Sequence, residues 1–402
     1  MLDTPFSPWP SFSEEEIEAV SRVLRSGRVN YWTGGEAKAF EEEFAEWCGA
    51  RHAIALANGT LALEAALRAL KIGPGDEVVV PARTFLATAS AAIQCGAVPV
   101  CADIDPDSQN VTAETIAAVL TPRTKAVICV HLAGWPCDMD PILALCDARG
   151  LALVEDCAQA HGARYKGRSV GTIGHIGCWS FCQDKIITTG GEGGMVTTNR
   201  RDWFEAMWAF KDHGKSWRAV HAREHPPGFR WLHESFGSNY RMTEMQAAIG
   251  RAQLRRLPEW SKARRGNAER IWRAAGQIQA LRAPTPSDGF EHAAYKAYVF
   301  VRPEALAEGW TRDRIVAAIE AAGAPCYTGS CSEIYLEKAF TEAGLGPKQR
   351  LPAAKALGEE SMMFLVHPTL RDDEIAKTCA ALQSVMAQAA RGGTSARTGT
   401  EG

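Results

Sequence analysis

A lysine beside a glycine-rich stretch is the strongest chemical signal in the sequence. Lys185 follows the segment that begins at Ser180, and residues 188–194 (TTGGEGG) contain four glycines. Removing an amine from water favours its uncharged form, which can attack a carbonyl group to form an imine. Glycine lets the main chain pass close to a flat ligand. We therefore expect Lys185 to be a reactive amine; a solvated surface lysine is the alternative.

A second signal is a pair of carboxylates at the end of an apolar run. Residues 151–154 (LALV) lead directly into Glu155 and Asp156, and the segment ends at Gly162. A carboxylate at the carboxyl end of a buried strand is well placed to pair with a cationic group of a ligand. A helix cap or an ordinary salt bridge is the alternative interpretation, and the residues alone leave both open.

Two further segments have the residue types of an anion site. In Asn58-Gly59-Thr60, backbone N–H groups at a helix start and the Thr60 hydroxyl can hold a phosphate. Asn239 and Arg241 precede a long helical stretch and suit anion contact. A simple cap remains open for both, with Thr60 itself as the N-cap in the first. Together with the lysine and the acid, these segments supply what pyridoxal 5′-phosphate requires of a protein.

The surrounding pattern predicts the elements that must position these residues. From about residue 50 the chain alternates between apolar, β-branched runs and Ala/Leu-rich stretches of helical period. The predicted strands are His52–Ala57, Glu77–Val80, Val98–Ala102, Ala126–Val130 and Leu151–Glu155, and the predicted helices are Thr60–Leu70, Thr88–Gln94, Ala113–Leu120 and Pro141–Ala148. This alternation indicates an α/β fold with a mostly parallel sheet between helices. Ligands of such sheets bind beyond the carboxyl ends of the strands.

The pattern changes in the last third of the chain. Residues 241–280 predict one or two long helices. The predicted elements beyond Pro284 are a strand at Tyr295–Val301 and helices at Asp313–Ala322 and Asp372–Ala390. We therefore expect a large domain over residues 1–270 and a small C-terminal α+β domain over residues 271–390. Residues 391–402 lack apolar periodicity and are expected to form a disordered tail.

Composition restricts the partners and the compartment. The 402 residues include 44 Lys plus Arg and 47 Asp plus Glu, a formal net charge of -3, which gives no general attraction to nucleic acid or to a membrane. The 12 cysteines lie mostly in apolar stretches without a Cys-x-x-Cys pair, so we expect free thiols and no metal site. Since no signal-peptide pattern occurs, a cytoplasmic protein is expected. Cys157 adjoins Asp156, which predicts inhibition by thiol reagents.

Five ordered motifs, with a matching N-terminal segment, resemble the DegT/DnrJ/EryC1/StrS family of sugar aminotransferases. The matching segments are GRVNYWTGGEAKAFEEEFAEWCGA (27–50), ANGT (57–60), PARTFLAT (81–88), EDCAQAHGA (155–163), SFCQDKIITTGGEGG (180–194) and GSNYRM (237–242). The resemblance extends over nearly all of residues 8–390. It implies a type I aminotransferase fold, in which a large domain with a mainly parallel seven-stranded sheet carries a small C-terminal domain, and it implies pyridoxal 5′-phosphate as the cofactor.

The resemblance also assigns the residues around the cofactor ring. It implies that Lys185 binds the cofactor covalently and then moves a proton during transfer. It implies that Asp156 keeps the pyridine nitrogen protonated, that Gln159 contacts the ring oxygen, and that Phe85 stacks on the ring. Some relatives carry His in place of the lysine and dehydrate sugars, and Lys185 argues against that branch.

The phosphate and the substrates receive a second set of residues from the same resemblance. Gly59, Thr60 and Ser180 would bind the phosphate, and Asn239 would reach it from the partner subunit of a homodimer with shared active sites. About the first 35 residues would form an arm along the active site. The residues implied or considered for substrate binding are Tyr31, Trp32, His213 and Tyr327. His161 and His213 are candidates for hydrogen bonds near the site, and a satisfied structural histidine is the alternative.

The usual reaction of the family gives the expected function. It is amino transfer from L-glutamate to a keto group of a nucleotide-linked deoxysugar, for antibiotic or polysaccharide biosynthesis. Residues 327–335 (YTGSCSEIY) depart from a histidine-containing stretch found in many sugar aminotransferases, which leaves the acceptor open. A basic stretch, Lys211–Arg230, either attracts a pyrophosphate or is a solvated loop. The alternatives are an aminotransferase for a cyclitol or other non-nucleotide ketone, and a non-catalytic cofactor-binding regulator.

Overall fold

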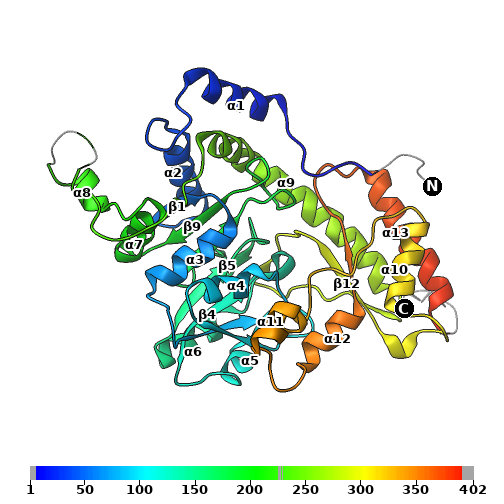
Figure 1. Cartoon of the computed structure of the whole chain (residues 1–402). Helices are drawn as coiled ribbons and strands as arrows, with labels where there is room; N and C mark the ends of the chain where they lie inside the picture. Colours follow the sequence, from blue (N-terminus) through cyan, green and yellow to red (C-terminus); the bar gives the residue numbers. More distant parts are fainter. Residues whose placement is uncertain (1–5, 225–227, 229, 392–402) are drawn as a thin grey trace.

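The computed structural model describes residues 6–224, 228 and 230–391, so most of the predicted tail, residues 392–402, lies outside the described residues. A large unit built around a central sheet is joined to a smaller C-terminal unit by one long helix (Figure 1). Within the described part of the chain, no helix combines the length and the apolar character that a membrane crossing requires.

The central sheet has seven strands in the order β1-β9-β8-β5-β4-β2-β3. Their bounds are β1 His52–Leu56, β2 Glu77–Pro81, β3 Val98–Ala102, β4 Thr124–Val130, β5 Ala152–Asp156, β8 Ile176–Ser180 and β9 Gly194–Thr198. Only β9 runs against the others, since it pairs antiparallel with both neighbours and the remaining pairs are parallel. This arrangement confirms the predicted α/β class and the mainly parallel seven-stranded sheet.

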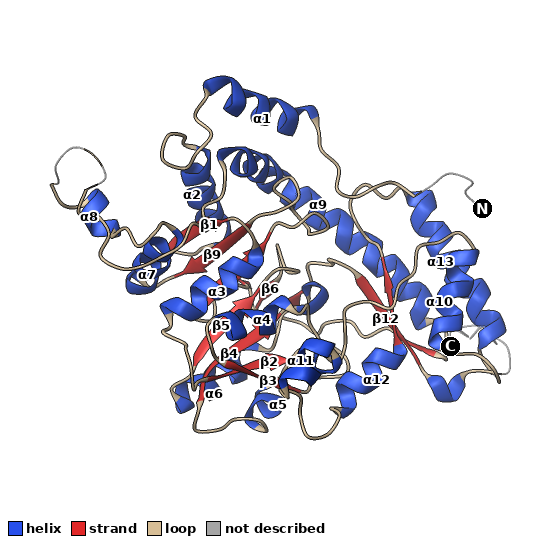
Figure 2. Ribbon diagram, viewed as in Figure 1, coloured by secondary structure: helices blue, strands red, loops and turns tan. Residues whose placement is uncertain are grey.

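The inner strands form because they are apolar on both faces. All five residues of β2 and of β8 are buried, as expected for strands covered by helices on both sides. The large-unit helices are α1 Glu14–Ser26, α2 Glu36–Cys48, α3 Gly59–Ala69, α4 Ala87–Gln94, α5 Ala113–Ala117, α6 Met139–Arg149, α7 Arg201–Lys211 and α8 Trp217–His221. Helices such as α3 and α2 cover the sheet, with α3 against β8 and β9 and α2 against β1, while α1 packs on α9 and α8 projects outward (Figure 2).

The structure corrects two helix predictions. The helix predicted to run to Leu120 ends at Ala117, because the following segment turns at Thr121 before β4 begins. Residues 241–280, predicted to form one or two helices, form the single helix α9, Glu244–Gly276, which continues across Pro258. Its start is fixed by a capping box in which the Thr243 side chain and Gln246 satisfy each other's backbone N–H groups.

The small unit has its own sheet and core. Its strands are β10 Leu281–Arg282, β12 Ala297–Val301 and β13 Ser361–Phe364, paired in that order. Its helices are α10 Arg312–Ala321, α11 Lys338–Ala343, α12 Pro352–Glu360 and α13 Asp372–Ala389. Short turns of 3₁₀ helix lie at Leu132–Gly134, Pro303–Ala305 and Ile334–Leu336, and a small separate sheet joins β6 Arg164–Tyr165, β7 Arg168–Ser169 and β11 Phe290–Glu291.

The predicted domain boundary at residue 270 falls inside α9. The first part of this helix, including Leu254 and Trp260, packs in a core cluster of the large unit. Its last turns, from Ala268 onward, pack in a cluster with β12, β13 and α13. Residues of this one helix therefore belong to the cores of both units. The division at residues 270/271 stays a prediction about where the two units separate.

Candidate active site

The predicted site residues gather where the parallel strands end. Gly59 and Thr60 follow β1, Phe85 follows β2, Asp156 ends β5, and Ser180 ends β8. Because these strands run in the same direction, their carboxyl ends lie along one edge of the sheet. Topology therefore brings together residues that are separated by more than a hundred positions in the sequence.

Lys185 lies in the loop between β8 and β9, with its side chain 15% exposed. Its Nζ is 4.0 Å from Asp184 Oδ1 and 5.1 Å from the centre of the Tyr295 ring. Its backbone carbonyl accepts a hydrogen bond of 2.9 Å from the Trp9 indole. The amine is thus held in a largely enclosed place, which excludes the alternative of a solvated surface lysine.

Asp156 is a buried carboxylate that accepts hydrogen bonds from few donors. It is 6% exposed, and its oxygens accept hydrogen bonds from the Thr88 hydroxyl at 2.9 Å and from Ala158 N–H at 3.1 Å. Burial raises the pKa of this carboxyl, and the two hydrogen bonds and the charge of Lys185 only partly oppose that rise. A carboxylate in this state is stabilised by a cationic partner, as a protonated pyridine nitrogen would be.

The side-chain oxygen of Gln159 already accepts a hydrogen bond from within the protein. Its Oε1 accepts a hydrogen bond of 2.8 Å from Ala133 N–H, and Ala133 adopts a left-handed backbone conformation with φ of 57°. Because the oxygen is fixed by this donor, the NH₂ group is the part of the amide that can donate to a ligand oxygen. That orientation suits the predicted contact with a ring oxygen.

The start of α3 makes a narrow cradle against the end of β8. A Cβ placed on Gly59 would lie 2.6 Å from Ser180 Cβ, so only glycine allows the helix to begin this close to Ser180. The N-cap of α3 is Asn58, whose side chain accepts from Leu61 N–H. The interpretation of Thr60 as the N-cap is therefore wrong; Thr60 stands in the first turn, where N–H groups and a hydroxyl suit a phosphate.

Phe85 is the exposed member of the set. Its ring is 71% exposed, although the neighbouring Thr84 is buried. An exposed aromatic ring at the mouth of a polar cluster is a suitable platform for a flat ligand. The exposed ring, the buried acid, the narrow cradle at Gly59 and the enclosed lysine together fit pyridoxal 5′-phosphate.

Asn239 and His213 lie on a segment that projects from the large unit. Both side chains are exposed, and Asn239 pairs through its backbone with Asp212. His213 has a left-handed backbone, with φ of 58°. Near them Trp231 is 84% exposed and Phe236 is 101% exposed. The predicted role of Asn239 in a partner's site requires this kind of exposure and stays a prediction.

Tyr31 is buried and Trp32 is partly buried. Tyr31 is 3% exposed, donates to Glu41 at 3.1 Å, and has the Lys211 ammonium 3.4 Å from its ring centre. It lines a pocket of about 370 Å³ with Glu41, Trp208 and other residues of α2, α7 and α8. Trp32 packs edge-on against Trp208. Their role in substrate binding stays a prediction, and the hydroxyl of Tyr31 is engaged by Glu41.

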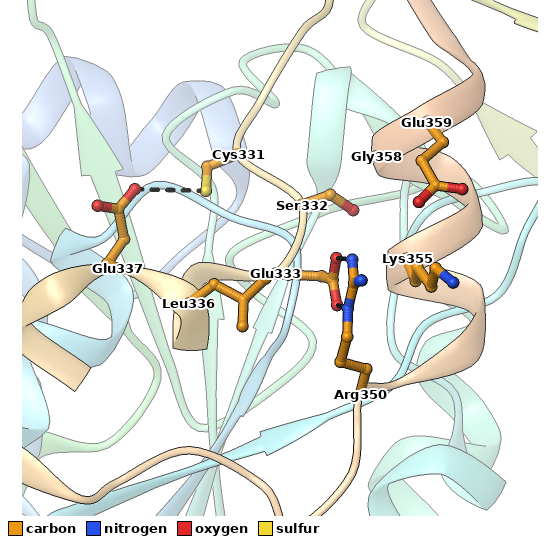
Figure 3. A pocket seen from close by; sticks show the side chains of 9 residues that line it. All are labelled: Cys331, Ser332, Glu333, Leu336, Glu337, Arg350, Lys355, Gly358 and Glu359. Atoms are coloured by element: carbon orange, nitrogen blue, oxygen red, sulfur yellow. Dashed lines mark hydrogen bonds and ion pairs between the residues drawn. The ribbon is translucent and has the colours of Figure 1, made fainter. Parts of the chain in front are cut away.

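Tyr327 is half-exposed at the start of the segment that departs from the family pattern. The segment continues into a second pocket, of about 380 Å³, between residues 331–337 and α12 (Figure 3). There Arg350 and Glu333 form a two-bonded ion pair, and Cys331 Sγ lies 3.7 Å from Glu337 Oε1. No residue predicted to bind the cofactor lines this pocket, so it is separate from the cluster at Lys185.

The basic stretch is largely neutralised within the chain. Lys215 pairs with the buried Asp212, Arg218 with Glu205, and Arg223 with Glu234. Lys211 is buried against aromatic rings, and burial lowers the pKa of its ammonium to about 8. Of the two interpretations of Lys211–Arg230, a free pyrophosphate-binding loop is therefore the less favoured.

Glu155, next to Asp156, has a structural role. Its oxygens accept hydrogen bonds from the backbone N–H groups of Gly171, Ile173 and Gly174 and from the His131 ring, at 2.6 to 3.0 Å. Among the described residues, His131, Glu155 and Cys157 are the one group spaced closely enough for a metal ion, but these hydrogen bonds already occupy the carboxylate. Glu155 thus holds backbone groups of residues 171–174 in place, and Asp156 is the member of the pair that is available to a ligand.

The cysteines are free, as predicted, and nine of the 12 are buried. Cys157 is 0% exposed, and burial raises the pKa of its thiol well above the usual value. The prediction that thiol reagents act through Cys157 is therefore wrong, since a reagent cannot reach the buried sulfur and the thiol stays protonated. Cys182, three residues before Lys185, is only partly buried.

The sequence interpretation missed the groups that surround Lys185 from other parts of the chain. Tyr295 donates to Asp184 and supports the lysine with its ring. Lys296 is half-buried nearby, and burial lowers the pKa of its ammonium to about 8. Tyr295 and Lys296 follow the predicted small domain's first residues, and no local motif links them to residue 185. Only the packing of the two units could reveal them.

His161 is neither a satisfied histidine nor a surface group. It is 0% exposed, and within the described residues neither ring nitrogen has a hydrogen-bond partner. Burial, with the charges of Lys185 and Arg264, lowers the pKa of the ring to about 3. The side chain is therefore a neutral imidazole packed between the Trp179 and Phe181 rings.

Comparison with known proteins gives a family and close structural relatives. Residues 10–383 match the model of the DegT/DnrJ/EryC1/StrS aminotransferase family. The solved structure of an aminotransferase from Psychrobacter cryohalolentis is similar with a TM-score of 0.93 and 58% identity, over 95% of this chain and 99% of that chain.

Two curated relatives act on nucleotide-linked sugars by name. UDP-N-acetyl-3-dehydro-alpha-D-glucosamine 3-aminotransferase from Acidithiobacillus ferrooxidans is 34% identical over 93% of this chain and 94% of its own. GDP-perosamine synthase from Caulobacter vibrioides is 48% identical over 56% of this chain and 58% of its own. The likeness extends through both units for the first relative and covers a little over half of each chain for the second.

Proposed function

Because this chain belongs to the DegT/DnrJ/EryC1/StrS aminotransferase family, we propose that it transfers an amino group from L-glutamate to a keto group of a nucleotide-linked deoxysugar. The protein is an aminotransferase of the type I fold, and its cofactor is pyridoxal 5′-phosphate. The glutamate donor, the nucleotide-linked acceptor, a cytoplasmic location and a homodimer with shared sites are parts of the proposal.

The placement of Lys185 in the loop after β8, close enough for its charge to act on Asp156 at the end of β5, is the observation that supports catalysis most directly. When bound, the cofactor supplies an aldehyde that receives the amino group and a ring that withdraws electrons. In the proposal Asp156 holds a proton at the ring nitrogen, and burial of the carboxylate strengthens that pairing. Lys185, enclosed beside Asp184 and Tyr295, moves a proton at the reacting carbon.

Around this pair, the remaining predicted residues would orient the cofactor. Gly59, Thr60 and Ser180 would hold its phosphate at the start of α3, the NH₂ group of Gln159 would donate to its ring oxygen, and the exposed face of Phe85 would cover its ring. The nucleotide-linked acceptor is supported by the names of the two curated relatives. The sugars in these two names are linked to different nucleotides, UDP and GDP, so the nucleotide base of the acceptor is left unassigned.

The central test is Lys185→Ala, compared with Lys262→Ala, which removes an exposed lysine of α9. We expect the purified wild-type protein to be yellow and borohydride to fix the cofactor on Lys185, detected by mass spectrometry of the tryptic peptide. Lys185→Ala should lose transfer and Lys262→Ala should retain it. Normal transfer by Lys185→Ala without added amine would refute the assignment of the lysine.

The substrates are tested separately by half-reactions. Glutamate and other amino acids are added to the wild-type protein, and the shift of the cofactor absorbance is followed. Amino sugars with and without a nucleotide are then tested in the reverse direction. Conversion by cyclitol amines but not by nucleotide-linked amino sugars would replace the proposed acceptor with the cyclitol alternative. A cofactor spectrum that no amine changes would indicate the regulatory alternative.

A further inference from the structure

The N-terminal segment of residues 6–10, which we call the N-terminal strap, crosses from the small unit to the loop that carries Lys185. Phe6 packs against the core of the small unit. The Ser7 backbone and hydroxyl both donate to Glu374 at the start of α13, and the Pro8 carbonyl accepts from the Thr369 hydroxyl at 2.8 Å. The strap is therefore fixed to the small unit before it reaches the large one.

Trp9 is the residue through which the strap contacts the reactive loop. Its indole N–H donates to the backbone carbonyl of Lys185 at 2.9 Å. Its ring is held on three sides, edge-on to Trp260 at 5.1 Å, stacked on His367 at 5.9 Å, and 4.8 Å from the Arg264 guanidinium. A donor held this firmly fixes the position of the acceptor that it contacts.

The loop is exposed before the lysine and buried after it. The Lys185 backbone N–H donates to the Cys182 carbonyl, and Gln183 and Asp184, which lie inside that turn, are exposed, whereas residues 186–189 are buried. The side chain of Lys185 rests on Tyr295, which comes from the small-unit end of the chain. Both the indole and the tyrosine therefore reach the loop from outside it, and only the indole contacts the main chain of residue 185 directly.

We propose that Trp9 is a positioning residue, which fixes the main chain of Lys185 by its indole N–H so that the ammonium group stays aligned between Asp184 and the Tyr295 ring. The inference rests on the proposed role of Lys185. Loss of this one donor leaves the lysine in place but lets its loop move, and misplacement by about 1 Å is enough to lower the rate of a positioned reaction strongly. Substrate binding does not depend on this contact.

The test compares Trp9→Phe with Trp9→His in the full-length protein as purified. Both variants replace the two fused rings of the indole by a single ring, but histidine can place Nε2–H where the indole holds its N–H, and phenylalanine has no donor. For Trp9→Phe we expect amide hydrogen exchange of residues 181–189 to become several times faster and kcat to fall about tenfold, with KM for both substrates within twofold. Trp9→His should restore most of the protection of residues 181–189 from exchange and most of kcat.

The matched control is Trp272→Phe. Trp272 also donates its indole N–H to a backbone carbonyl, that of Tyr298 at 3.1 Å, but inside the small unit. Its replacement should speed exchange around Tyr298 and leave residues 181–189 and kcat unchanged. An effect of Trp272→Phe on residues 181–189 equal to that of Trp9→Phe would mean that general loosening explains both, and the proposal would be rejected.

Two other results would also overturn the inference. One is an amide hydrogen exchange rate of residues 181–189 in Trp9→Phe that equals the wild-type rate. The other is a Trp9→His variant whose exchange rate and kcat are no closer to wild type than those of Trp9→Phe. If Trp9→Phe unfolds below the assay temperature, benzothienylalanine at position 9, which keeps the ring size and replaces N–H by sulfur, makes the same comparison. The exchange measurement does not require that Lys185 bind the cofactor, so it separates this inference from the proposed function, which Lys185→Ala tests.

Discussion

Asp156 and Glu155 are neighbours at the end of β5, but successive side chains of a strand point to opposite faces of the sheet. Glu155 turns toward residues 171–174 and His131. Asp156 turns toward Thr88 on α4. One carboxylate is saturated by backbone donors, while the other keeps capacity for a ligand. The same kind of side chain thus serves a structural and a chemical purpose one position apart.

At this residue scale, Asp156→Asn is predicted to lower kcat of the loaded enzyme about a hundredfold, because a neutral amide does not hold a proton at a ring nitrogen as a buried carboxylate does. The side-chain oxygen of Asn still accepts from Thr88 or from Ala158, so the fold should be kept. Steady-state rates with saturating cofactor, beside circular dichroism of both proteins, measure the effect. Activity within twofold of wild type would contradict the role proposed for Asp156.

The same substitution is predicted to change the pH dependence of stability without cofactor. Burial raises the pKa of Asp156, so the folded protein binds this proton more tightly than the unfolded chain, and stability is lost as pH rises above the ordinary value of about 3.9. Cofactor-free Asp156→Asn should therefore melt at a higher temperature than wild type at pH 7, and the difference should shrink near pH 3.5. A lower melting temperature at pH 7 would oppose this argument.

The residues at the ends of the strands and helices contribute more to the candidate site than the residues in the middle of these elements. The first turn of α3 and the last residue of β8 meet because Gly59 has no side chain, and Asn58 supplies the cap that lets Thr60 face a ligand. The loop before β8 is similarly held, since its backbone N–H groups donate to Glu155. In each case the strand or helix provides direction, and the residue at its end provides the chemistry.

For α3, Gly59→Ala is predicted to weaken cofactor retention and to lower stability by about 1–3 kcal/mol, because a Cβ would lie 2.6 Å from Ser180 Cβ. The control is Gly266→Ala in α9, where a Cβ would meet nothing within 4 Å. That change should leave cofactor binding unaltered and raise stability by about 0.5–1 kcal/mol. Cofactor dissociation constants and urea unfolding of both variants provide the comparison; equal behaviour would exclude a cradle at Gly59.

For the loop before β8, Glu155→Gln is predicted to destabilise the fold by about 3 kcal/mol, since its NH₂ group would face backbone donors and leave one or more of them unpaired. Thermal and urea unfolding measure the loss. The cofactor affinity of protein that remains folded should stay within a few-fold of wild type. A selective loss of chemistry with unchanged stability would reverse the roles of Glu155 and Asp156.

In the whole molecule, helix α9 and the N-terminal strap join the two units, together with contacts such as Arg83 with Ser361 and Asp103 with Ala353. Helix α9 contributes to both cores, and the N-terminal strap runs from Glu374 to Lys185. The site is thus framed by the N-terminal strap, the central sheet and the small unit. Asn239, Trp231 and Phe236 are exposed, and the chain next to Asn239 pairs with the end of β1, which is consistent with the proposed homodimer.

The proposed dimer predicts complementation between two defective chains. If the partner's Asn239 completes the phosphate site of each Lys185, hybrids of Lys185→Ala and Asn239→Ala chains contain one intact site. Differently tagged chains are mixed, allowed to exchange and purified as hybrids, and we expect roughly half of wild-type activity, far above either parent. Hybrid activity equal to the average of the parents would place Lys185 and Asn239 of one site in the same chain.

Much of this arrangement could be predicted because it depends on local signals. The strands from β1 to β5 and the helices α3, α4 and α6 lie within about two residues of their predicted bounds, since buried strands and amphipathic helices have different periods. The motif around Lys185 and Asp156 was also visible as a run of adjacent residues. The N-cap of α3 was assigned to the wrong residue because Asn and Thr are both good caps, and only the backbone conformation separates them.

The α/β class, the order of the motifs and the identity of the lysine and the acid follow from residues that are close together along the chain. The tertiary structure alone decided which of two adjacent carboxylates is free, which cysteines are accessible, and that Trp9, Tyr295 and Lys296 surround residue 185. The contacts of residue 185 depend on packing between segments more than a hundred residues apart, whereas the partners of Glu155 and Asp156 lie between residues 88 and 174. No local preference encodes such a contact, since it is stable only when both cores have formed.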